Sequence, residues 1–392
     1  MSCPACSEGT LESFFRVESA PGNSCLLMES AEEARAYPRG TIDLGFCSRC
    51  GFISNQAIDL SLTEYSGRYE ETQGFSPTFR KFHERLARDL IERHDLRNKH
   101  VVEIGCGKGE FLHMLCAFGD NDGLGFDPSY IEGREQPIRG ERVRFITEYF
   151  SSDQSVDEAD FVACKMTLEH IPECREFMSA IRHSVHGQPD TVVFIQVPEA
   201  TRILTECAFE DIYYEHCSYF TPYSLRRLFD GLGFEVVRSD IEYDGQYLTV
   251  EGRYGQPGSS SPSSGLADDA ELTRLKDLVG SFPQRVAEKV GQWRDEIQRR
   301  TAAGERIVLW GSGSKGVSFL TTLGITDEIE HVVDINPHRQ GFFMAGTGQR
   351  IVAPEDLKSL RPDYVVIMNR IYTEEIRQML TELGLHPELA AL

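Results

Sequence analysis

Features that would place a protein in other classes are missing from this sequence of 392 residues. No apolar run approaches the roughly 20 residues that a membrane-spanning helix needs. The amino terminus, MSCPACSEGT, lacks the charged and then apolar pattern of a secretory signal peptide. Basic residues are in deficit, with 40 Lys and Arg against 62 Asp and Glu, and a net charge of -22 repels phosphate backbones. We therefore expect a soluble cytoplasmic protein that binds neither membranes nor nucleic acid.

The cysteines are more informative through their positions than through their number. Four of the eleven form two Cys-x-x-Cys pairs, Cys3 with Cys6 and Cys47 with Cys50. Two such pairs can place four thiolates around one tetrahedral zinc ion and leave no open coordination position. A reducing cytosol disfavours disulfides, and the missing βαβ context disfavours a redox motif. The pairs therefore predict a structural zinc ion in an N-terminal module, residues 1–58.

A glycine-rich turn follows in HVVEIGCGKGEFLHML, where an apolar strand over 100–104 leads into a helix. Glycines let the backbone approach a ligand at the carboxyl end of a strand. The acid Glu103 precedes the turn, and Asp127 in GLGFDPS ends the next strand about 20 residues on, where a carboxylate can bind the hydroxyls of an adenosine ribose. The turn itself contains Gly105, Gly107 and Gly109.

The spacing of these glycines separates two cofactor classes. A dinucleotide site has GxGxxG, because the turn must accommodate a pyrophosphate. Here the pattern is GxGxG after an acid, which suits a cationic sulfonium and an amino group. Two further strands, in ADFVACKMTLEHIP and TVVFIQVPEA, complete a pattern that resembles class I S-adenosylmethionine-dependent methyltransferases. That resemblance implies cofactor contacts by the acids and glycines above and by Met166 and Glu169.

The stretch IYYEHCSYFT, residues 212–221, crowds proton-handling side chains into ten residues. It lies between the strand predicted in TVVFIQVPEA and a helix predicted over 222–231, so we expect it above the carboxyl ends of the strands, beside the methyl donor. Glu215 next to His216 can move protons near neutral pH. The stretch is therefore a candidate active-site loop.

Several parts of the chain together resemble the C-methyltransferases that act on nucleotide-linked keto-deoxysugars. These parts are the double Cys-x-x-Cys module, the core, the loop Tyr-x-Glu-His-x-x-Tyr-Phe, and a C-terminal domain with GSGSKG and DINPHRQG. The resemblance implies His216 as general base, with Tyr213 and Glu215 nearby. Tyr214, where such loops often have histidine, and the strand YDGQYLTVEG depart from the pattern near the expected substrate pocket, so the sugar stays open.

These residue types suit carbon methylation, which next to a ketone requires removal of an α-proton and stabilisation of an enolate. His216 is a suitable base, Glu215 can orient it or raise its basicity, and Tyr213 can donate a hydrogen bond to the oxyanion. His216 could equally deprotonate a hydroxyl, so O- or N-methylation stays open. A purely structural histidine is the other alternative.

Between the zinc module and the core, a helix is predicted from Ser76, with Pro77 in its first turn and apolar residues at helical spacing. The preceding tyrosines, Tyr65 and Tyr69, occupy the place of a lid in the related enzymes. A lid would exclude water from the reacting groups, and Tyr69 would then contact substrate. A plain connector is the alternative.

The C-terminal third begins after GQPGSSSPSSG, residues 255–265, a composition typical of a linker. A long helix is predicted over 267–300. A strand and the turn GSGSKG follow, with glycines spaced as GxGxxG, and Asp334 ends the next strand. This spacing fits an NAD-dependent oxidoreductase, whereas the family resemblance implies a domain that frames the substrate. We expect substrate contacts by Ser314, Lys315 and Asn369, and by Tyr214 of the loop.

The predicted fold is α/β, with a class I methyltransferase Rossmann-like core, the zinc module and a second, C-terminal Rossmann-like domain. The expected boundaries are 1–58, 59–254 and 267–392. The expected function is methyl transfer from S-adenosylmethionine to carbon of a small molecule, a nucleotide-linked keto-deoxysugar in natural-product or polysaccharide biosynthesis. A non-enzymatic binding module is the third class considered, and it would leave Glu103, Asp127 and His216 unexplained.

Overall fold

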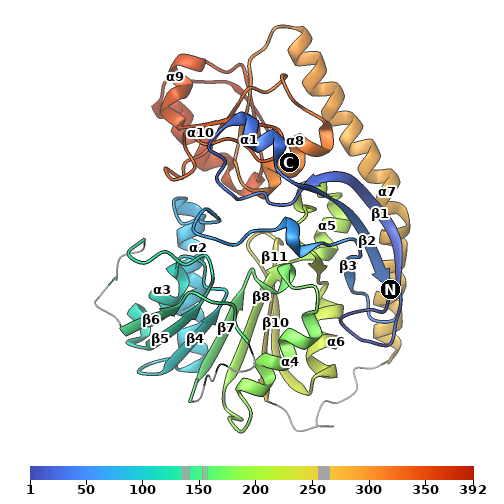
Figure 1. The fold of residues 1–392 in the computed structure, drawn as a ribbon, viewed down its shortest axis with the longest axis vertical. Coiled ribbons are helices and arrows are strands. Elements are labelled where there is room, and N and C mark those ends of the chain that lie inside the picture. Colours follow the sequence, from blue (N-terminus) through green and yellow to red (C-terminus); the bar gives the residue numbers. More distant parts are fainter. Residues whose placement is uncertain (135–137, 139–141, 152–153, 155, 157, 255–264) are drawn as a thin grey trace.

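The chain folds around three β-sheets (Figure 1). A computed structural model describes residues 1–134, 138, 142–151, 154, 156, 158–254 and 265–392. Except for Gly265, the predicted linker lies outside the described residues. No helix in the described part of the chain is long and apolar enough to cross a membrane.

The central sheet has seven strands in the order β10-β11-β8-β7-β4-β5-β6. Strands β4 to β8 are parallel, and β11 runs antiparallel to both β8 and β10. The chain reverses its direction of winding between β4 and β7, which is where an open parallel sheet binds its ligand. The strands are β4 (His100–Ile104), β5 (Asp122–Phe126), β6 (Arg142–Ile146), β7 (Phe161–Lys165), β8 (Val192–Pro198), β10 (Phe234–Glu242) and β11 (Tyr247–Tyr254).

Helices flank this sheet, and α2 (Pro77–His94) shows why the sequence folds as it does. The Ser76 side chain accepts a hydrogen bond from the Phe79 amide, and Pro77 fills the first turn, where no amide donor is needed. The helix predicted from Ser76 is therefore confirmed. The other helices of the core are α3 (Glu110–Gly119), α4 (Cys174–Ser184), α5 (Ala200–Glu206) and α6 (Pro222–Gly231), with 3₁₀ turns at Leu60–Leu62, Leu168–His170 and Phe209–Asp211.

The N-terminal sheet takes one strand from far along the chain. Strands β1 (Leu11–Pro21), β2 (Arg39–Cys47) and β3 (Ile53–Asn55) are antiparallel, and α1 (Ala31–Ala36) joins β1 to β2. The fourth strand, β9 (Ser218–Tyr219), belongs to the candidate active-site loop and pairs with β3. Phe52 and Phe220 pack beside this pairing, with ring centroids 5.0 Å apart.

The C-terminal residues form a sheet of five parallel strands in the order β14-β13-β12-β15-β16. Helix α7 (Gly265–Ala302) leads into this sheet and confirms the helix predicted over 267–300. The remaining elements are β12 (Ile307–Trp310), α8 (Ser314–Leu323), β13 (His331–Val333), β14 (Arg350–Val352), α9 (Leu357–Leu360), β15 (Tyr364–Ile367), α10 (Thr373–Glu382) and β16 (Glu388–Ala391), with 3₁₀ turns at Pro354–Asp356 and Arg370–Tyr372.

The N-terminal residues contact both of the other parts. Helix α7 runs along one side of the molecule beside β1 (Figure 1), and the rings of Phe14 and Phe15 pack against Phe282 on that helix. Isolated β-bridges join Leu26 to Tyr69 and Met28 to Phe343. The segment between β1 and α1 therefore lies next to both the predicted lid and the C-terminal sheet.

Candidate active site

A cavity of about 1180 Å³ is lined by residues of both the core and the C-terminal sheet. It brings together residues that are far apart in the sequence. Gly109, Tyr214 and Glu215 are outside its lining, whereas the other predicted cofactor, base and substrate residues line it. Those residues are Tyr69, Glu103, Gly105, Gly107, Asp127, Met166, Glu169, Tyr213, His216, Ser314, Lys315 and Asn369.

The glycine-rich turn can only be built from glycine. Gly105, Gly107 and Gly109 have φ angles of 72°, 54° and 90°, in the left-handed region that side chains disfavour. A Cβ at Gly105 or Gly107 would also clash with Thr167 or Glu71. Asp127 holds the turn, because it accepts a hydrogen bond of 2.8 Å from the Gly107 amide. Its other oxygen accepts two of 2.7 Å from Ser129.

Two carboxylates beside this turn, the buried Glu103 and the partly exposed Glu71, have free hydrogen-bonding capacity. One Glu103 oxygen has no hydrogen-bond partner, and burial raises the pKa of this side chain to about 8. Glu71 also has an oxygen without a hydrogen-bond partner, and burial raises its pKa to about 7. Buried acids are costly unless a cation meets them. Lys108 Nζ already lies 3.6 Å from Glu71. The ammonium or sulfonium group of S-adenosylmethionine would supply a cation to Glu103, so this turn fits that cofactor.

Sequence reasoning missed Glu71 and also Lys165, the last residue of β7. The Lys165 ammonium is buried, 3.4 Å from His83 Nε2 and 4.8 Å from the centroid of the Phe111 ring. Burial lowers the pKa of Lys165, and Glu103 opposes that shift. A charged residue ending an otherwise apolar strand was the signal available for Lys165. Glu71 carried no such signal, because it lies in a polar stretch outside any motif.

His216 and Tyr213 form a hydrogen-bonded pair at the cavity wall. The Tyr213 hydroxyl is 2.7 Å from His216 Nε2, and the two ring centroids are 4.0 Å apart. His216 Nδ1 is buried without a hydrogen-bond partner. Burial lowers the pKa of His216 well below its ordinary value, so its imidazole is neutral near pH 7. A neutral imidazole is the form that accepts a proton.

Glu215 faces the N-terminal segment. Its carboxylate accepts hydrogen bonds of 3.1 Å from Asn23 Nδ2 and 2.9 Å from the Ser24 amide, and a further one from the Ser24 hydroxyl. Burial raises the pKa of Glu215 to about 7. We expected Glu215 to orient His216, but the hydrogen bonds of the Glu215 carboxylate go to Asn23 and Ser24 instead. The carboxylate at ion-pair distance from His216 Nε2 is Glu169, at 4.0 Å.

Tyr214 lies on the side of the loop away from the cavity. Its side chain is buried, and its hydroxyl accepts a hydrogen bond of 2.8 Å from the Asp59 amide. Its ring lies against Gly40 of β2, where any larger residue would clash with it. In this structure Tyr214 packs the loop onto the N-terminal sheet.

His170, which was not among the predicted site residues, stands beside this pair. Its ring lies edge-on to that of His216 with centroids 4.8 Å apart, and the Tyr65 hydroxyl is 2.9 Å from its Nδ1. Burial lowers the pKa of His170 to about 4. Tyr65 and the buried Tyr69 ring are also in contact, 5.0 Å apart. Tyr65 of the predicted lid therefore packs against His170, and Tyr69 packs against Tyr65.

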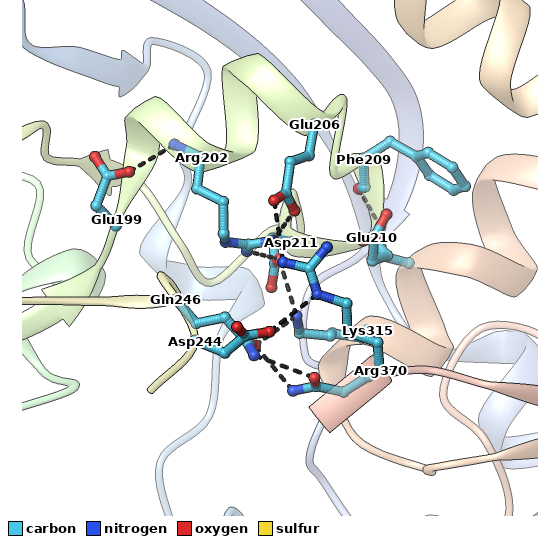
Figure 2. A network of polar contacts seen from close by, with 12 residues as sticks. Glu199, Arg202, Glu206, Phe209, Glu210, Asp211, Asp244, Gln246, Lys315 and Arg370 are labelled. Carbon is cyan, nitrogen blue, oxygen red and sulfur yellow. Dashed lines mark hydrogen bonds and ion pairs between the residues drawn. The ribbon is translucent and has the colours of Figure 1, made fainter. Parts of the chain in front are cut away.

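Figure 2 shows how Lys315, one of the predicted substrate residues, is held by side chains of the core. Lys315 Nζ is 2.9 Å from an oxygen of Asp211 and 3.2 Å from Gln246 Oε1. Asn369 donates a hydrogen bond of 2.8 Å to the same Gln246 oxygen, and Arg202 forms an ion pair with Asp211. Because Asp211, Gln246 and Arg202 belong to the core, this network joins the two parts of the chain. The Ser314 hydroxyl shares a hydrogen bond of 2.7 Å with Ser24.

The four predicted zinc ligands lie together at the end of β2, whose last residue is Cys47. Their sulfur atoms all lie within 4.8 Å of one another, with Cys3 and Cys50 3.6 Å apart and Cys6 and Cys47 3.8 Å apart. A disulfide would bring two sulfurs to about 2.05 Å. Four sulfurs about 2.3 Å from a central zinc ion would be about 3.8 Å apart. The four cysteines therefore fit a tetrahedral zinc ion.

The GxGxxG turn of the C-terminal sheet is closely packed. Gly316 lies against the Gly311 carbonyl, where a Cβ would clash. Asp334 accepts hydrogen bonds of 2.9 Å from the Ser312 amide and 2.8 Å from the Asn336 amide. These bonds occupy the acid that an oxidoreductase would use for a ribose.

Comparisons with known proteins agree with this site. Residues 79–239 match a family described as a methyltransferase domain, and residues 267–385 match a family described as a C-methyltransferase C-terminal domain. The C-methyltransferase NovU of Streptomyces niveus is 24% identical over 366 residues, which are 89% of this chain and 85% of the relative.

Solved structures with a similar region were also found. A 1,6-didemethyltoxoflavin-N1-methyltransferase of Burkholderia thailandensis, solved with S-adenosylhomocysteine, has 19% identity and a TM-score of 0.35 over 46% of this chain and 82% of its own. The magnesium protoporphyrin IX methyltransferase of Synechocystis PCC 6803 has 17% identity and a TM-score of 0.36 over 45% of this chain and 84% of its own.

The central sheet and the family matches define a class I, S-adenosylmethionine-dependent methyltransferase. Within that class, the match of residues 267–385 to a C-methyltransferase C-terminal domain marks the chain as a C-methyltransferase. The match of residues 267–385 also favours this interpretation of the GxGxxG turn over an NAD-dependent oxidoreductase.

Proposed function

We propose that this C-methyltransferase methylates a carbon next to a ketone in a nucleotide-linked keto-deoxysugar, with His216 as general base. The observation that carries the proposal is the contact between His216 Nε2 and the Tyr213 hydroxyl at the cavity wall. Removing a proton next to a carbonyl requires a base at the carbon and a hydrogen-bond donor at the neighbouring oxygen. The His216 imidazole and the Tyr213 hydroxyl lie next to each other here. The α-carbon and the ketone oxygen of the substrate are likewise close together, so the pair can serve both atoms.

In the proposed reaction, neutral His216 accepts the α-proton at Nε2, and the electrons of the C–H bond form the enolate. The Tyr213 hydroxyl turns from His216 to the ketone oxygen, where negative charge develops. S-adenosylmethionine, bound near Glu103 and Asp127, supplies the electrophilic methyl group. Tyr65 and Tyr69 close the site against water, which would otherwise protonate the enolate.

The size and charge of the cavity support a substrate larger than a simple ketone. Its volume of about 1180 Å³ exceeds the roughly 300 to 1,000 Å³ that is usual for one small ligand, so it offers room for a second. Lys315 and Ser314 lie at the beginning of α8, and Arg339 lines the same wall. Cations and a helix N-terminus suit the phosphates of a sugar nucleotide. O- or N-methylation of another metabolite is the alternative.

We further propose that zinc bound by Cys3, Cys6, Cys47 and Cys50 has a structural role. The metal would fix the end of β2 at Cys47 to the segment that contains Cys3 and Cys6. Strand β2 pairs with β3, and β3 pairs with β9 in the loop that carries His216. Zinc would thereby support the catalytic loop without contacting the substrate.

The proposal is tested with a panel of nucleotide-linked keto-sugars and labelled S-adenosylmethionine, with the products examined by mass spectrometry and NMR. The expected product has its new methyl group on carbon, and the enzyme exchanges the neighbouring proton in deuterated water. The His216→Asn variant should lose about 10²- to 10⁴-fold in turnover, together with exchange, while it still binds S-adenosylmethionine. A methyl group found on oxygen or nitrogen would contradict the proposal.

A further inference from the structure

Glu169 is a buried carboxylate that no hydrogen bond explains. It lies in the 3₁₀ turn Leu168–His170 directly after β7, and the residue is 1% exposed. Neither of its carboxylate oxygens has a hydrogen-bond partner. One of them, Oε1, is 4.0 Å from His216 Nε2, the atom that also contacts the Tyr213 hydroxyl. An orphaned buried acid therefore faces the nitrogen proposed to take the substrate proton.

We propose that Glu169 receives, through His216, the proton that His216 removes from the substrate carbon. The inference rests on the proposed function, because it needs His216 to act as the base. Glu169 would act through His216 and would not contact the substrate, so it is a positioning residue and the endpoint of the proton's path.

Each step of this transfer conserves protons and electrons. The substrate C–H bond breaks and an Nε2–H bond forms on His216, with the electron pair left in the enolate. The Nε2–H bond then breaks and an O–H bond forms on Glu169, which changes from carboxylate to carboxylic acid. The enolate electrons form the new bond to the methyl group while the sulfonium S–C bond breaks and leaves its electron pair on sulfur. Glu169 returns its proton to water when the products leave.

The direction of transfer follows from the surroundings of the two groups. Burial raises the pKa of Glu169 to about 8, and burial lowers the pKa of His216 well below its ordinary value. A proton on His216 therefore moves downhill to an ionised Glu169. Several titratable groups lie around Glu169 besides His216. They are the neighbouring His170, Lys165 and Cys164 of β7, Tyr65 of the lid, Tyr213 and Cys217 of the loop, and Tyr247 of β11.

A different proton acceptor or a metal ion at this cluster fits the geometry less well. Glu215 is the neighbouring carboxylate in sequence, but its oxygens already accept hydrogen bonds from Asn23 and Ser24. Glu169, His170 and His216 are also close enough to hold a metal ion. Against that, His170 Nδ1 is hydrogen-bonded to Tyr65, and His216 Nε2 to Tyr213.

The test compares Glu169→Gln with Glu176→Gln, at an exposed glutamate of α4 that is outside the cavity lining. Single-turnover rates are measured between about pH 6 and pH 9. Because Glu169 must be ionised to accept a proton, the wild-type rate should rise with pH through about 8. Glu169→Gln should lose this rise and about 10²-fold in rate. S-adenosylmethionine affinity should be unchanged, because in this proposal Glu169 faces His216 and is not the cofactor contact that the family resemblance implies. Glu176→Gln should match the wild type.

A Glu169→Gln variant with the wild-type rate and pH profile would overturn the inference. So would a second equivalent of bound metal in the wild type that disappears in this variant. If the glutamine variant does not fold, Glu169→Asp decides: the carboxylate is kept, so the rise with pH should persist at a lower rate, and an unchanged rate would overturn the inference. Failure of the proposed function is recognised separately, because the wild type itself would then form no C-methylated product.

Discussion

Glu215 accepts a hydrogen bond of 2.9 Å from the amide of Ser24, which is 191 residues away in sequence. The Ser24 hydroxyl also contacts Ser314, the first residue of α8. The loop that carries His216 is therefore fastened to the N-terminal segment, and that segment to the C-terminal sheet. Glu215 acts in this structure as the anchor of the catalytic loop.

This anchor should make stability depend on pH. The pKa of Glu215 is raised from 4.5 in the unfolded chain to about 7 by burial. A raised pKa in the folded state means that its contribution to stability is complete below about pH 4.5 and is lost as the pH rises through about 7. The stability of the wild type relative to Glu215→Gln, measured as the difference between their unfolding midpoints, should therefore fall as the pH rises from about 4.5 to about 7. A difference that is constant from pH 4 to 8 would contradict this interpretation.

For the metal, we expect about one zinc per chain in protein purified without chelators, measured by elemental analysis. Cys47→Ser should lose zinc and lower the unfolding midpoint, because a site of three thiolates no longer closes the tetrahedron. Cys207→Ser, at a free cysteine far from the cluster in sequence, should retain the metal. Wild-type protein without zinc would rule this site out.

For the cofactor, Asp127→Ala should weaken S-adenosylmethionine binding by about 1 to 3 kcal/mol, since bonds to the ribose and to the Gly107 amide are lost together. Gly107→Ala should weaken it at least as much, because φ is positive there and a Cβ would clash with Glu71. Calorimetry measures both affinities. Asp122→Asn, at the partly exposed start of β5, serves as the control, and equal affinities in all three variants would place the cofactor elsewhere.

Tyr213→Phe should lower kcat by about 10²- to 10³-fold, because one donor to the enolate oxygen is lost. The variant should still exchange the α-proton, slowly, because His216 remains. A normal kcat would show that another group stabilises the enolate. Tyr214→Phe is the matched control in the same loop, since Tyr214 packs outside the cavity lining.

Lys315→Ala should raise the KM for the sugar nucleotide and leave the Kd for S-adenosylmethionine unchanged, because Lys315 lines the cavity on the side of the C-terminal sheet. Lys358→Ala, an exposed lysine of α9, should change neither value. An unchanged KM in Lys315→Ala would mean that this lysine serves only its ion pair with Asp211, and that the phosphates bind elsewhere.

Local sequence patterns determined much of this protein. Paired cysteines, the glycines of the first turn and the apolar strand before them each depend on neighbours within a few residues. The cluster of four cysteines, β4, α2 and α7 could therefore be placed from the sequence, and so could the position of the loop with His216 at the cavity.

What tertiary structure alone decided is the direction of each side chain within those segments. Glu215 precedes His216 in the sequence, whereas Glu169 is close to it in space. No sequence pattern shows which of the two carboxylates faces the histidine. Pairing of β9 with β3 turns Glu215 towards Ser24, and the turn after β7 places Glu169 at 4.0 Å from His216. These contacts join segments that are far apart along the chain. Their distances depend on side-chain packing and strand pairing, which the local sequence does not specify.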